Sequence, residues 1–304
     1  MHSGARISWR AELVRLGFRT FIKNRHRPEP IDVERERFQR MERWVPPPPR
    51  GTRIEQVSVG GVPGEVVATA ASAPDRHVLF LHGGAYSVGS PRLYRLFTWR
   101  LANAARARVL AIEYRLAPEH PFPAALEDAL KAYRWLLGQG ADPRRLAVAG
   151  DSAGGGLTFA AMLKLRDEGT PLPSAAVAMS PWTDLALTGA SLHANAASDP
   201  MLVASEVPRL ARFYVPESEA RNPYASPLYG DPRGLSPTLI QVGSDEILRD
   251  DAVRMAEKMK AAGCEVELQV WPRMPHVFQV LAAVVPEARK AIAEIARFLQ
   301  AKLA

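Results

Sequence analysis

The sequence predicts an α/β protein whose mostly parallel sheet is covered by helices on both faces. Two short β-rich runs come first, Ile54–Val59 and Glu65–Thr69, and the Gly60-Gly61 turn between them is typical of a hairpin. After this hairpin, short apolar runs alternate with segments of helical periodicity. Because such alternation is typical of strands joined by crossover helices, it indicates a sheet buried between two helical layers.

The elements follow one another in a regular order. The strands expected after the hairpin are Val78–Leu81, Val109–Ile112, Leu146–Ala149, Ala175–Met179, Leu239–Val242 and Val266–Val270. The expected helices are Arg92–Ala105, Pro123–Leu137, Ala153–Arg166, Arg249–Ala262 and Pro286–Leu303. The interval from Trp182 to Pro237 is longer than an ordinary connection and contains Pro, Asn and Gly throughout, so we interpret it as an insertion.

Residues 1–45 have a different character, because apolar residues recur there with helical spacing among arginines and acids. This pattern predicts two amphipathic helices, separated at Pro28-Glu29-Pro30 and ended by Pro46–Pro49, since proline removes an amide donor. The stretch lacks the apolar run of a signal peptide, and no later segment reaches about 18 apolar residues. We therefore expect a cytoplasmic protein without stable membrane insertion. A Trp/Leu/Phe stripe beside arginines is also typical of helices at a membrane surface, and this alternative stays open.

The composition excludes several classes of protein. The chain has 304 residues, of which 47% are hydrophobic and 23% charged, close to the ~45–50% and ~25% of ordinary globular proteins. Wholesale disorder, a collagen-like chain and a membrane bundle are thereby excluded. The net charge of +7 is mostly due to arginine, but no basic stripe alternates with aromatic residues, so nucleic acid is not an expected partner. The single cysteine, Cys264, has no partner for a disulfide or a metal site.

The segment Gly150-Asp151-Ser152-Ala153-Gly154 matches G-x-S-x-G, the pattern of a nucleophile elbow. An apolar strand leads into it and a helical pattern follows, so the serine would lie on a strained strand-to-helix turn with its Oγ exposed. We predict Ser152 as a nucleophile, with Asp151 ordering the turn or a bound water. A glycine-rich turn with an inert serine is the alternative.

The segment His82-Gly83-Gly84-Ala85 also follows a predicted strand, Val78–Leu81. Open α/β sheets bind ligands at the carboxyl ends of their strands, so this loop and Ser152 share one edge. Its amides can turn toward a developing oxyanion, and losing one such donor costs ~2.7–4 kcal/mol. A phosphate-binding turn is the alternative, although no P-loop Lys-Ser/Thr follows.

These motifs together resemble the bacterial branch of the hormone-sensitive-lipase-like carboxylesterases (family IV esterases), which have the α/β-hydrolase fold. The resemblance runs from about residue 50 to the end and rests on His82–Ala85, Tyr114–Ala125, Gly150–Gly155, Ser180–Trp182, Asp199–Met201, Ser226–Tyr229, Gly243–Asp245 and His276–Phe278. It implies one catalytic domain, residues 46–304, with about eight strands of which the second is antiparallel. It also implies a helical cap formed by residues 1–45 and the insertion at about 183–235.

The serine needs a general base, and His276 is the histidine best placed to act as one. The other six histidines lie in the N-terminal segment, at a strand start, in the glycine-rich loop, in a proline-rich turn or in the insertion. The chain order of this fold puts an orienting acid between Ser152 and His276. Asp245 directly follows the strand Leu239–Val242 and stands at the family's position, so we predict Asp245. The competing acids nearby are Glu246, Asp250 and Asp251.

The resemblance implies hydrolysis of short-chain carboxylic esters through an acyl-enzyme, with no metal or other cofactor. The backbone amides of Gly84, Ala85 and Ala153 are expected to hold the oxyanion while Gly83 shapes the loop, with Ala85 at a negative φ. The expected partner is a small-molecule ester, and the family tendency favours a homodimer. Amide or N-acyl hydrolysis by the same triad is the main alternative, and a catalytically silent receptor with the same fold is another.

Overall fold

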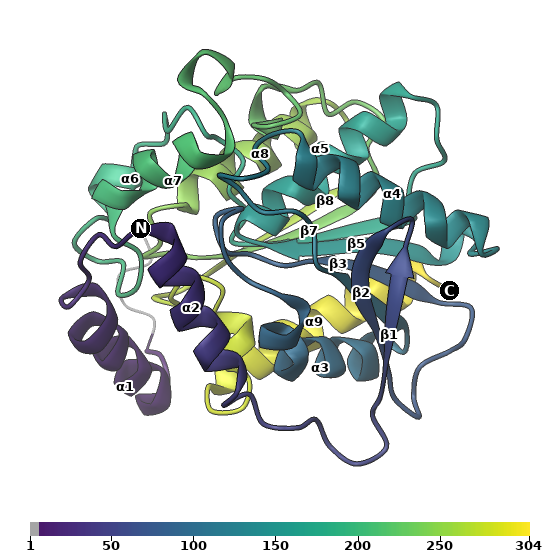
Figure 1. The fold of residues 1–304 in the computed structure, drawn as a ribbon, viewed down its shortest axis with the longest axis horizontal. Coiled ribbons are helices and arrows are strands. Elements are labelled where there is room, and N and C mark those ends of the chain that lie inside the picture. Colours follow the sequence, from purple (N-terminus) through teal and green to yellow (C-terminus); the bar gives the residue numbers. More distant parts are fainter. Residues whose placement is uncertain (1–5) are drawn as a thin grey trace.

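Eight strands form one sheet in the computed structural model, which describes residues 6–304 (Figure 1). The strands are β1 (Arg53–Val59), β2 (Val62–Ala68), β3 (His77–Leu81), β4 (Arg108–Ile112), β5 (Leu146–Asp151), β6 (Ala175–Met179), β7 (Thr238–Gly243) and β8 (Val266–Trp271). Their order in the sheet is β1-β2-β4-β3-β5-β6-β7-β8. Strand β2 is antiparallel to both of its neighbours, and all other pairs are parallel. The predicted α/β fold with a mostly parallel sheet is confirmed.

The central strands read as unbroken apolar runs because both of their faces are covered. All six residues of β5 are buried, as expected for a parallel strand between two helical layers. In the register of β3 and β5, Leu81 lies opposite Gly150. This pairing brings the loop after β3 next to the turn after β5, so the two glycine-rich motifs meet at one edge of the sheet.

Nine helices accompany the sheet within the described residues. They are α1 (Trp9–Gly17), α2 (Ile31–Glu42), α3 (Arg95–Ala105), α4 (Ala124–Gly138), α5 (Ala153–Asp167), α6 (Ser191–Ala194), α7 (Val207–Tyr214), α8 (Arg249–Ala261) and α9 (Pro286–Lys302). Helices α3 and α9 cover one face of the sheet, and α4, α5 and α8 cover the other (Figure 1). Helix α3 begins later than predicted because Pro91–Tyr94 forms a 3-10 turn first.

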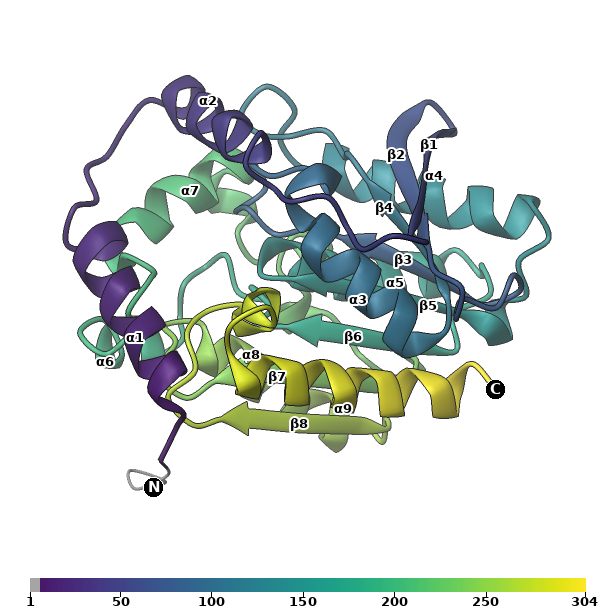
Figure 2. The ribbon, with the colours of Figure 1, turned by 90° about the horizontal axis from the view of Figure 1, so that it is seen from below.

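The first two helices lie near the carboxyl ends of the parallel strands, together with α6 and α7 of the insertion (Figure 2). Helix α1 continues as a π-helical turn, Phe18–Lys23, and the proline-rich stretch separates it from α2 as predicted. Residues 1–5 of the predicted cap lie outside the described residues, and the domain boundary at residue 45 stays a prediction. Within residues 6–304, no helix has the length and apolarity that crossing a membrane requires.

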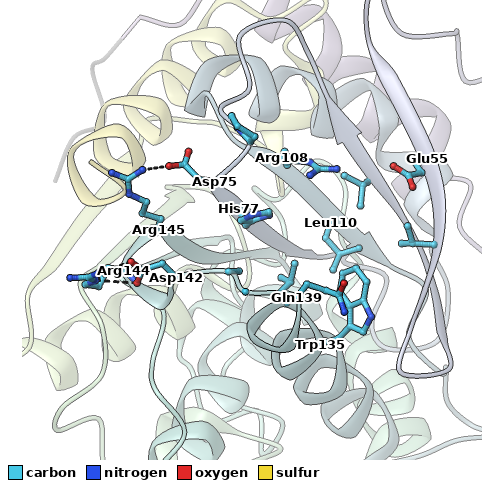
Figure 3. Close-up of a pocket in the computed structure, with 16 residues that line it drawn as sticks. Glu55, Asp75, His77, Arg108, Leu110, Trp135, Gln139, Asp142, Arg144 and Arg145 are labelled. Atoms are coloured by element: carbon cyan, nitrogen blue, oxygen red, sulfur yellow. Dashed lines mark hydrogen bonds and ion pairs between the residues drawn. The ribbon is translucent and has the colours of Figure 1, made fainter.

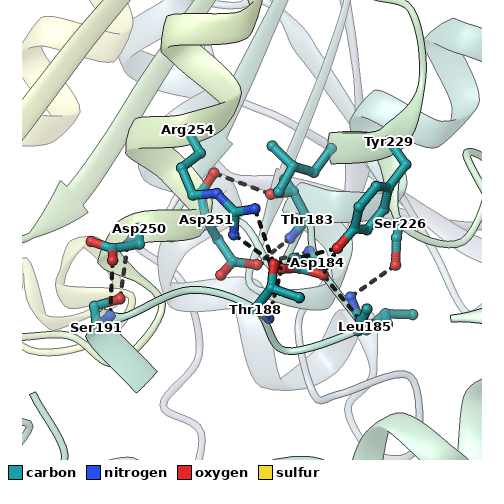
Figure 4. Close-up of polar contacts among 12 residues, drawn as sticks. Thr183, Asp184, Leu185, Thr188, Ser191, Ser226, Tyr229, Asp250, Asp251 and Arg254 are labelled. Carbon is teal, nitrogen blue, oxygen red and sulfur yellow. Dashed lines mark hydrogen bonds and ion pairs between the residues drawn. The ribbon is translucent and has the colours of Figure 1, made fainter. Parts of the chain in front are cut away.

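A polar cluster around two buried aspartates, Asp184 and Asp251, fixes the insertion to α8 (Figure 4). Asp184 accepts hydrogen bonds from Thr188, Tyr229 and Arg254, and Asp251 accepts two, both 2.8 Å long, from the amides of residues 183 and 184. Burial, together with the charge of Asp184, raises the pKa of Asp251 to about 8. Burial also acts to raise the pKa of Asp184, but the hydrogen bonds that it accepts outweigh this effect and lower it. The cluster holds the insertion beside the loop that follows β7.

Candidate active site

Ser152 stands between β5 and α5 in the strained conformation expected of a nucleophile elbow, with φ 52° and ψ −121°. A non-glycine residue in such a sparsely populated region costs about 1–3 kcal/mol, so the surrounding structure must hold it. The Ser152 amide donates to the Met179 carbonyl at 2.9 Å, and its own carbonyl accepts from the Trp182 amide at 2.9 Å. A Cβ at Gly154 would overlap the Leu81 carbonyl oxygen, so glycine lets α5 begin directly against the end of β3.

His276 is buried and forms a hydrogen bond with an acidic side chain, its Nδ1 lying 2.8 Å from Oε2 of Glu246. The other carboxylate oxygen of Glu246 accepts hydrogen bonds from the Ser180 hydroxyl at 2.8 Å and the Gly243 amide at 2.5 Å. The Ser180 hydroxyl in turn accepts from the Val277 amide at 3.1 Å. Ser180 therefore joins the acid to the backbone beside the histidine.

The structure contradicts the prediction that Asp245 orients His276. One carboxylate oxygen of Asp245 accepts a hydrogen bond from Arg15 of α1 at 2.7 Å, and the other accepts from the Ser244 hydroxyl at 2.9 Å. In the turn after β7, the two consecutive acids point in different directions, Asp245 toward α1 and Glu246 into the interior. Glu246, one of the competing acids, is the partner of His276.

The charges around the site shift the pKa values of two groups. Burial acts to lower the pKa of His276. The hydrogen bond and charge of Glu246, with smaller effects of Asp199 and Asp151, outweigh burial, so the pKa is raised above 6.5. Burial raises the pKa of Asp151 to about 7, although Tyr94 and the charge of His276 act to lower it. Asp151 therefore titrates near neutral pH, and the pKa of His276 is higher than that of an ordinary histidine.

Asp151 holds the loop after β3. Its two carboxylate oxygens accept hydrogen bonds from the Gly83 amide at 3.0 Å and the Tyr94 hydroxyl at 2.7 Å. A Cβ at Gly83 would collide with the Asp151 carboxylate, which explains glycine at this position. Because its amide already donates a hydrogen bond to Asp151, Gly83 does not offer a donor to an oxyanion, and this bond suits the expected role of Gly83 in shaping the loop.

Ala85 has φ 51°, which contradicts the expected negative value. The left-handed conformation continues at Tyr86, with φ 59°, while the amides of Ser87 and Val88 donate to the Gly84 carbonyl at 2.9 and 3.0 Å. The buried Tyr86 ring stacks on Tyr214 of α7, with ring centroids 3.7 Å apart. Ala85 and Tyr86 therefore form a tight turn with left-handed backbone conformations, and this turn places the Tyr86 ring against the insertion.

The buried side chain of His82 stabilises the loop that follows β3. Burial lowers its pKa to about 4, so the ring is neutral, and its Nδ1 donates to the Gly83 carbonyl, 2.7 Å away. The ring stacks on Tyr114 at a centroid distance of 4.2 Å, and the Tyr114 hydroxyl donates to the His82 carbonyl at 2.7 Å. His82 therefore contributes to the shape of the loop, and it is not a candidate base.

A cavity of about 450 Å³ brings the motifs together. Ser152, His276 and the loop after β3 line it, with a wall of apolar side chains from the N-terminal helices and the insertion: Phe18, Phe38, Met41, Leu202 and Leu210. Glu34 also lines the cavity, but its carboxylate is paired with Arg209 at 2.7 Å. The volume lies within the ~300–1,000 Å³ range of small-molecule sites.

Comparison with known proteins identifies the family. A model of the α/β-hydrolase fold family matches residues 78–280. An acetyl-hydrolase of Streptomyces hygroscopicus is 46% identical over 80% of this chain and 84% of its own, and an esterase of Acinetobacter venetianus is 37% identical over 81% of each. A crystal structure of an esterase from the bacterial hormone-sensitive lipase family superposes with a TM-score of 0.93 at 42% identity, covering 99% of this chain and 100% of the other. The chain belongs to the hormone-sensitive-lipase-like family of α/β hydrolases. The family inferred from the motifs is thereby confirmed.

This α/β hydrolase also has a larger cavity, of about 880 Å³, at the amino ends of strands β3 and β4, away from Ser152 (Figure 3). His77 and Arg108, the first residues of β3 and β4, line it. Two of its three arginines are ion-paired, Arg144 with Asp142 and Arg145 with Asp75. No serine, threonine or cysteine lines this cavity, so it offers no hydroxyl or thiol nucleophile.

Sequence reasoning missed two residues that position the site of this α/β hydrolase. The sequence gives Ser180 only as part of the motif Ser180–Trp182 and places Tyr94 in an expected helix, and it predicts a role for neither. The Ser-Pro-Trp stretch directly after β6 was the available signal for Ser180, because it lies at the same sheet edge as Ser152. No local signal distinguishes Tyr94, whose contact with Asp151 spans 57 residues.

Proposed function

We propose that this carboxylesterase hydrolyses esters of short carboxylic acids through an acyl-enzyme formed on Ser152. The observation that carries the proposal is the shared apolar cavity, which Ser152 and His276 both line while Glu246 binds the far side of the imidazole. Serine, histidine and acid in this arrangement are the elements of nucleophilic acyl transfer.

In the proposed mechanism, Nε2 of His276 accepts the proton of the Ser152 hydroxyl as Oγ attacks the ester carbonyl carbon. The imidazolium then gives this proton to the leaving alcohol oxygen, and the same base activates the water that hydrolyses the acyl-enzyme. Glu246 keeps the proton on Nδ1 and stabilises the imidazolium. Its carboxylate is suited to this task because three hydrogen bonds fix it in the interior.

We infer that the amides of Gly84, Ala85 and Ala153 stabilise the oxyanion that develops on the carbonyl oxygen. Ala153 is the first residue of α5, so the partial positive charge of the helix N-terminus adds to the effect of its amide. Gly83 supports this loop through its bond to Asp151 and does not contact the oxyanion.

The size and apolar lining of the cavity favour short acyl chains, and a relative that is named acetyl-hydrolase supports the same preference. A series of p-nitrophenyl esters from two to sixteen carbons tests it, with Ser152→Ala as the inactive control. The largest kcat/KM is expected between two and eight carbons. An optimum at twelve or more carbons would contradict the proposed substrate class.

The same series separates ester from amide hydrolysis when p-nitroacetanilide is included beside p-nitrophenyl acetate. Both substrates would pass through the same tetrahedral intermediate, so only their relative rates distinguish the two activities. The ester is expected to react at least a hundredfold faster. Comparable rates for the two would favour the amidase alternative.

A further inference from the structure

The first helical segment, residues 6–27, carries almost the whole net charge of the protein. It contains seven Lys and Arg side chains against the single acid Glu12, which accounts for +6 of the net charge of +7. Five of these basic side chains are exposed, namely Arg6, Arg10, Arg19, Arg25 and Arg27. This concentration of positive charge lies on a helix, a turn and their flanks, whereas the rest of the chain is nearly neutral.

The same segment exposes an apolar stripe. Trp9, Leu13 and Leu16 are separated by four and three residues, so they share one face of α1, and they are 67%, 57% and 61% exposed. Phe21 and Ile22, in the π-helical turn that continues α1, are also exposed. A stripe of large apolar side chains in water is unfavourable, and exposed patches of this kind mark surfaces of interaction.

The opposite face of α1 is fixed to the protein. Ala11 is buried, the Ser8 hydroxyl donates to Glu287 at 2.8 Å, and Arg15 is ion-paired with Asp245 at 2.7 Å. Helix α1 lies at the periphery of the molecule in both Figure 1 and Figure 2. These contacts hold the helix with its apolar stripe directed away from the rest of the described chain.

We propose that residues 6–27 bind the surface of an anionic phospholipid bilayer. An apolar stripe flanked by arginines is the pattern of helices that lie in a membrane interface, with the apolar side chains among the acyl chains and the guanidinium groups at the phosphates. The guanidinium groups of Arg10 and Arg25 lie 5.4 and 5.1 Å from the rings of Trp9 and Phe21, so charge and apolar surface are adjacent. The binding is peripheral, in agreement with the absence of a membrane-spanning helix from residues 6–304.

This surface adjoins the candidate active site. Phe18 directly follows α1 and lines the cavity that holds Ser152. Docking of α1 on a bilayer therefore places the cavity close to a surface in which apolar esters dissolve. The proposal concerns binding alone and does not depend on the proposed esterase mechanism.

Co-sedimentation with vesicles tests the proposal. The intact protein is mixed with sucrose-loaded vesicles of phosphatidylcholine alone or with 30% phosphatidylglycerol, at 50 and 500 mM NaCl. We expect at least tenfold stronger partitioning to the anionic vesicles at low salt, and a clear loss at high salt because the charges are screened. The triple variant Trp9→Gln, Leu13→Gln, Leu16→Gln is expected to lose at least tenfold in partitioning.

A matched control replaces exposed apolar residues elsewhere, with Val270→Gln and Val284→Gln, and is expected to bind as the wild type does. Turnover of p-nitrophenyl acetate verifies that each variant is folded, and it is expected to stay within twofold of wild type. Equal partitioning to both vesicle types, no partitioning, or full binding by the triple variant would overturn the proposal. A wild-type protein that is a dimer without vesicles, with a triple variant that is a monomer, would also overturn the proposal. A second copy of the chain would then cover the stripe.

Discussion

Glu246 binds His276 through a hydrogen bond of 2.8 Å between two buried side chains. Asp245, the residue before it, is instead ion-paired with Arg15 of the first helix. Two adjacent carboxylates in one turn therefore have separate partners, one inside the site and one in the N-terminal segment. This separation allows the contribution of each to be measured by a single substitution.

We predict that Glu246→Gln lowers kcat by about 10²- to 10⁴-fold, since an amide in place of the acid of such a triad favours the wrong imidazole tautomer. Asp245→Asn is the matched control and is expected to lower kcat less than tenfold, because its carboxylate binds Arg15 and not His276. Steady-state kinetics on p-nitrophenyl acetate measure both variants. The reverse order of the two effects would restore Asp245 as the orienting acid.

The dependence of activity on pH is expected to reflect the raised pKa of His276. Only the neutral imidazole can accept the Ser152 proton, so kcat/KM should rise with pH and reach half of its maximum above pH 6.5. In Glu246→Gln, the negative charge that raises this pKa is lost while burial still acts to lower it, so the midpoint of the residual activity moves to lower pH. Profiles of kcat/KM from pH 5 to 9 test both statements, and an unshifted midpoint in the variant contradicts the second.

The buried Asp251 is expected to make the fold less stable as pH rises. Its pKa is about 8 in the folded protein and ~3.9 in the unfolded chain, so between these values the folded state binds a proton that the unfolded state has released. The free energy of unfolding therefore falls as pH increases across this window. Asp251→Asn removes this titration, while its side-chain oxygen can still accept from the amides of residues 183 and 184.

Urea denaturation at pH 5 and pH 8 measures the effect. The decrease in the free energy of unfolding between these pH values should be smaller in Asp251→Asn than in wild type, by at least about 1 kcal/mol. Asp250→Asn, in the adjacent and less buried position, serves as the control and should retain the wild-type decrease. If both variants show the wild-type slope, Asp251 does not titrate in this range.

The parts of the molecule that local sequence determines were predictable. Leu146–Ala149 reads as a buried strand because it is covered on both faces, and the glycines around Ser152 predict the sharp turn that follows. His276 could be found because it is the one histidine that follows the last strand of the sheet. The structure places Ser152 and His276 on one cavity, and their catalytic roles stay a proposal.

The acid could not be assigned correctly, because Asp245 and Glu246 follow the same strand and the local sequence does not show which of the two side chains points toward His276. That direction depends on partners distant in sequence, since Arg15 lies 230 residues from Asp245 and Ser180 lies 66 residues from Glu246. The left-handed conformation of Ala85 escaped prediction for a similar reason. It belongs to a turn whose next residue, Tyr86, packs on Tyr214 of the insertion.

The conformation of Ala85 leads to a prediction for this loop. The left-handed conformation of an L-residue destabilises the folded protein by roughly 1–2 kcal/mol, and glycine removes this strain. Glycine also gives the unfolded chain more conformational entropy, which destabilises the folded state by about 0.4–1 kcal/mol. Ala85→Gly should therefore change the free energy of unfolding by less than about 1 kcal/mol and keep at least about a tenth of wild-type kcat, since its amide remains. Ala85→Val should lose more of both, because a β-branched side chain tolerates φ near 51° poorly. Urea denaturation and turnover of p-nitrophenyl acetate measure the pair, and a hundredfold loss of kcat in Ala85→Gly would show that the methyl group itself packs the loop into its active shape.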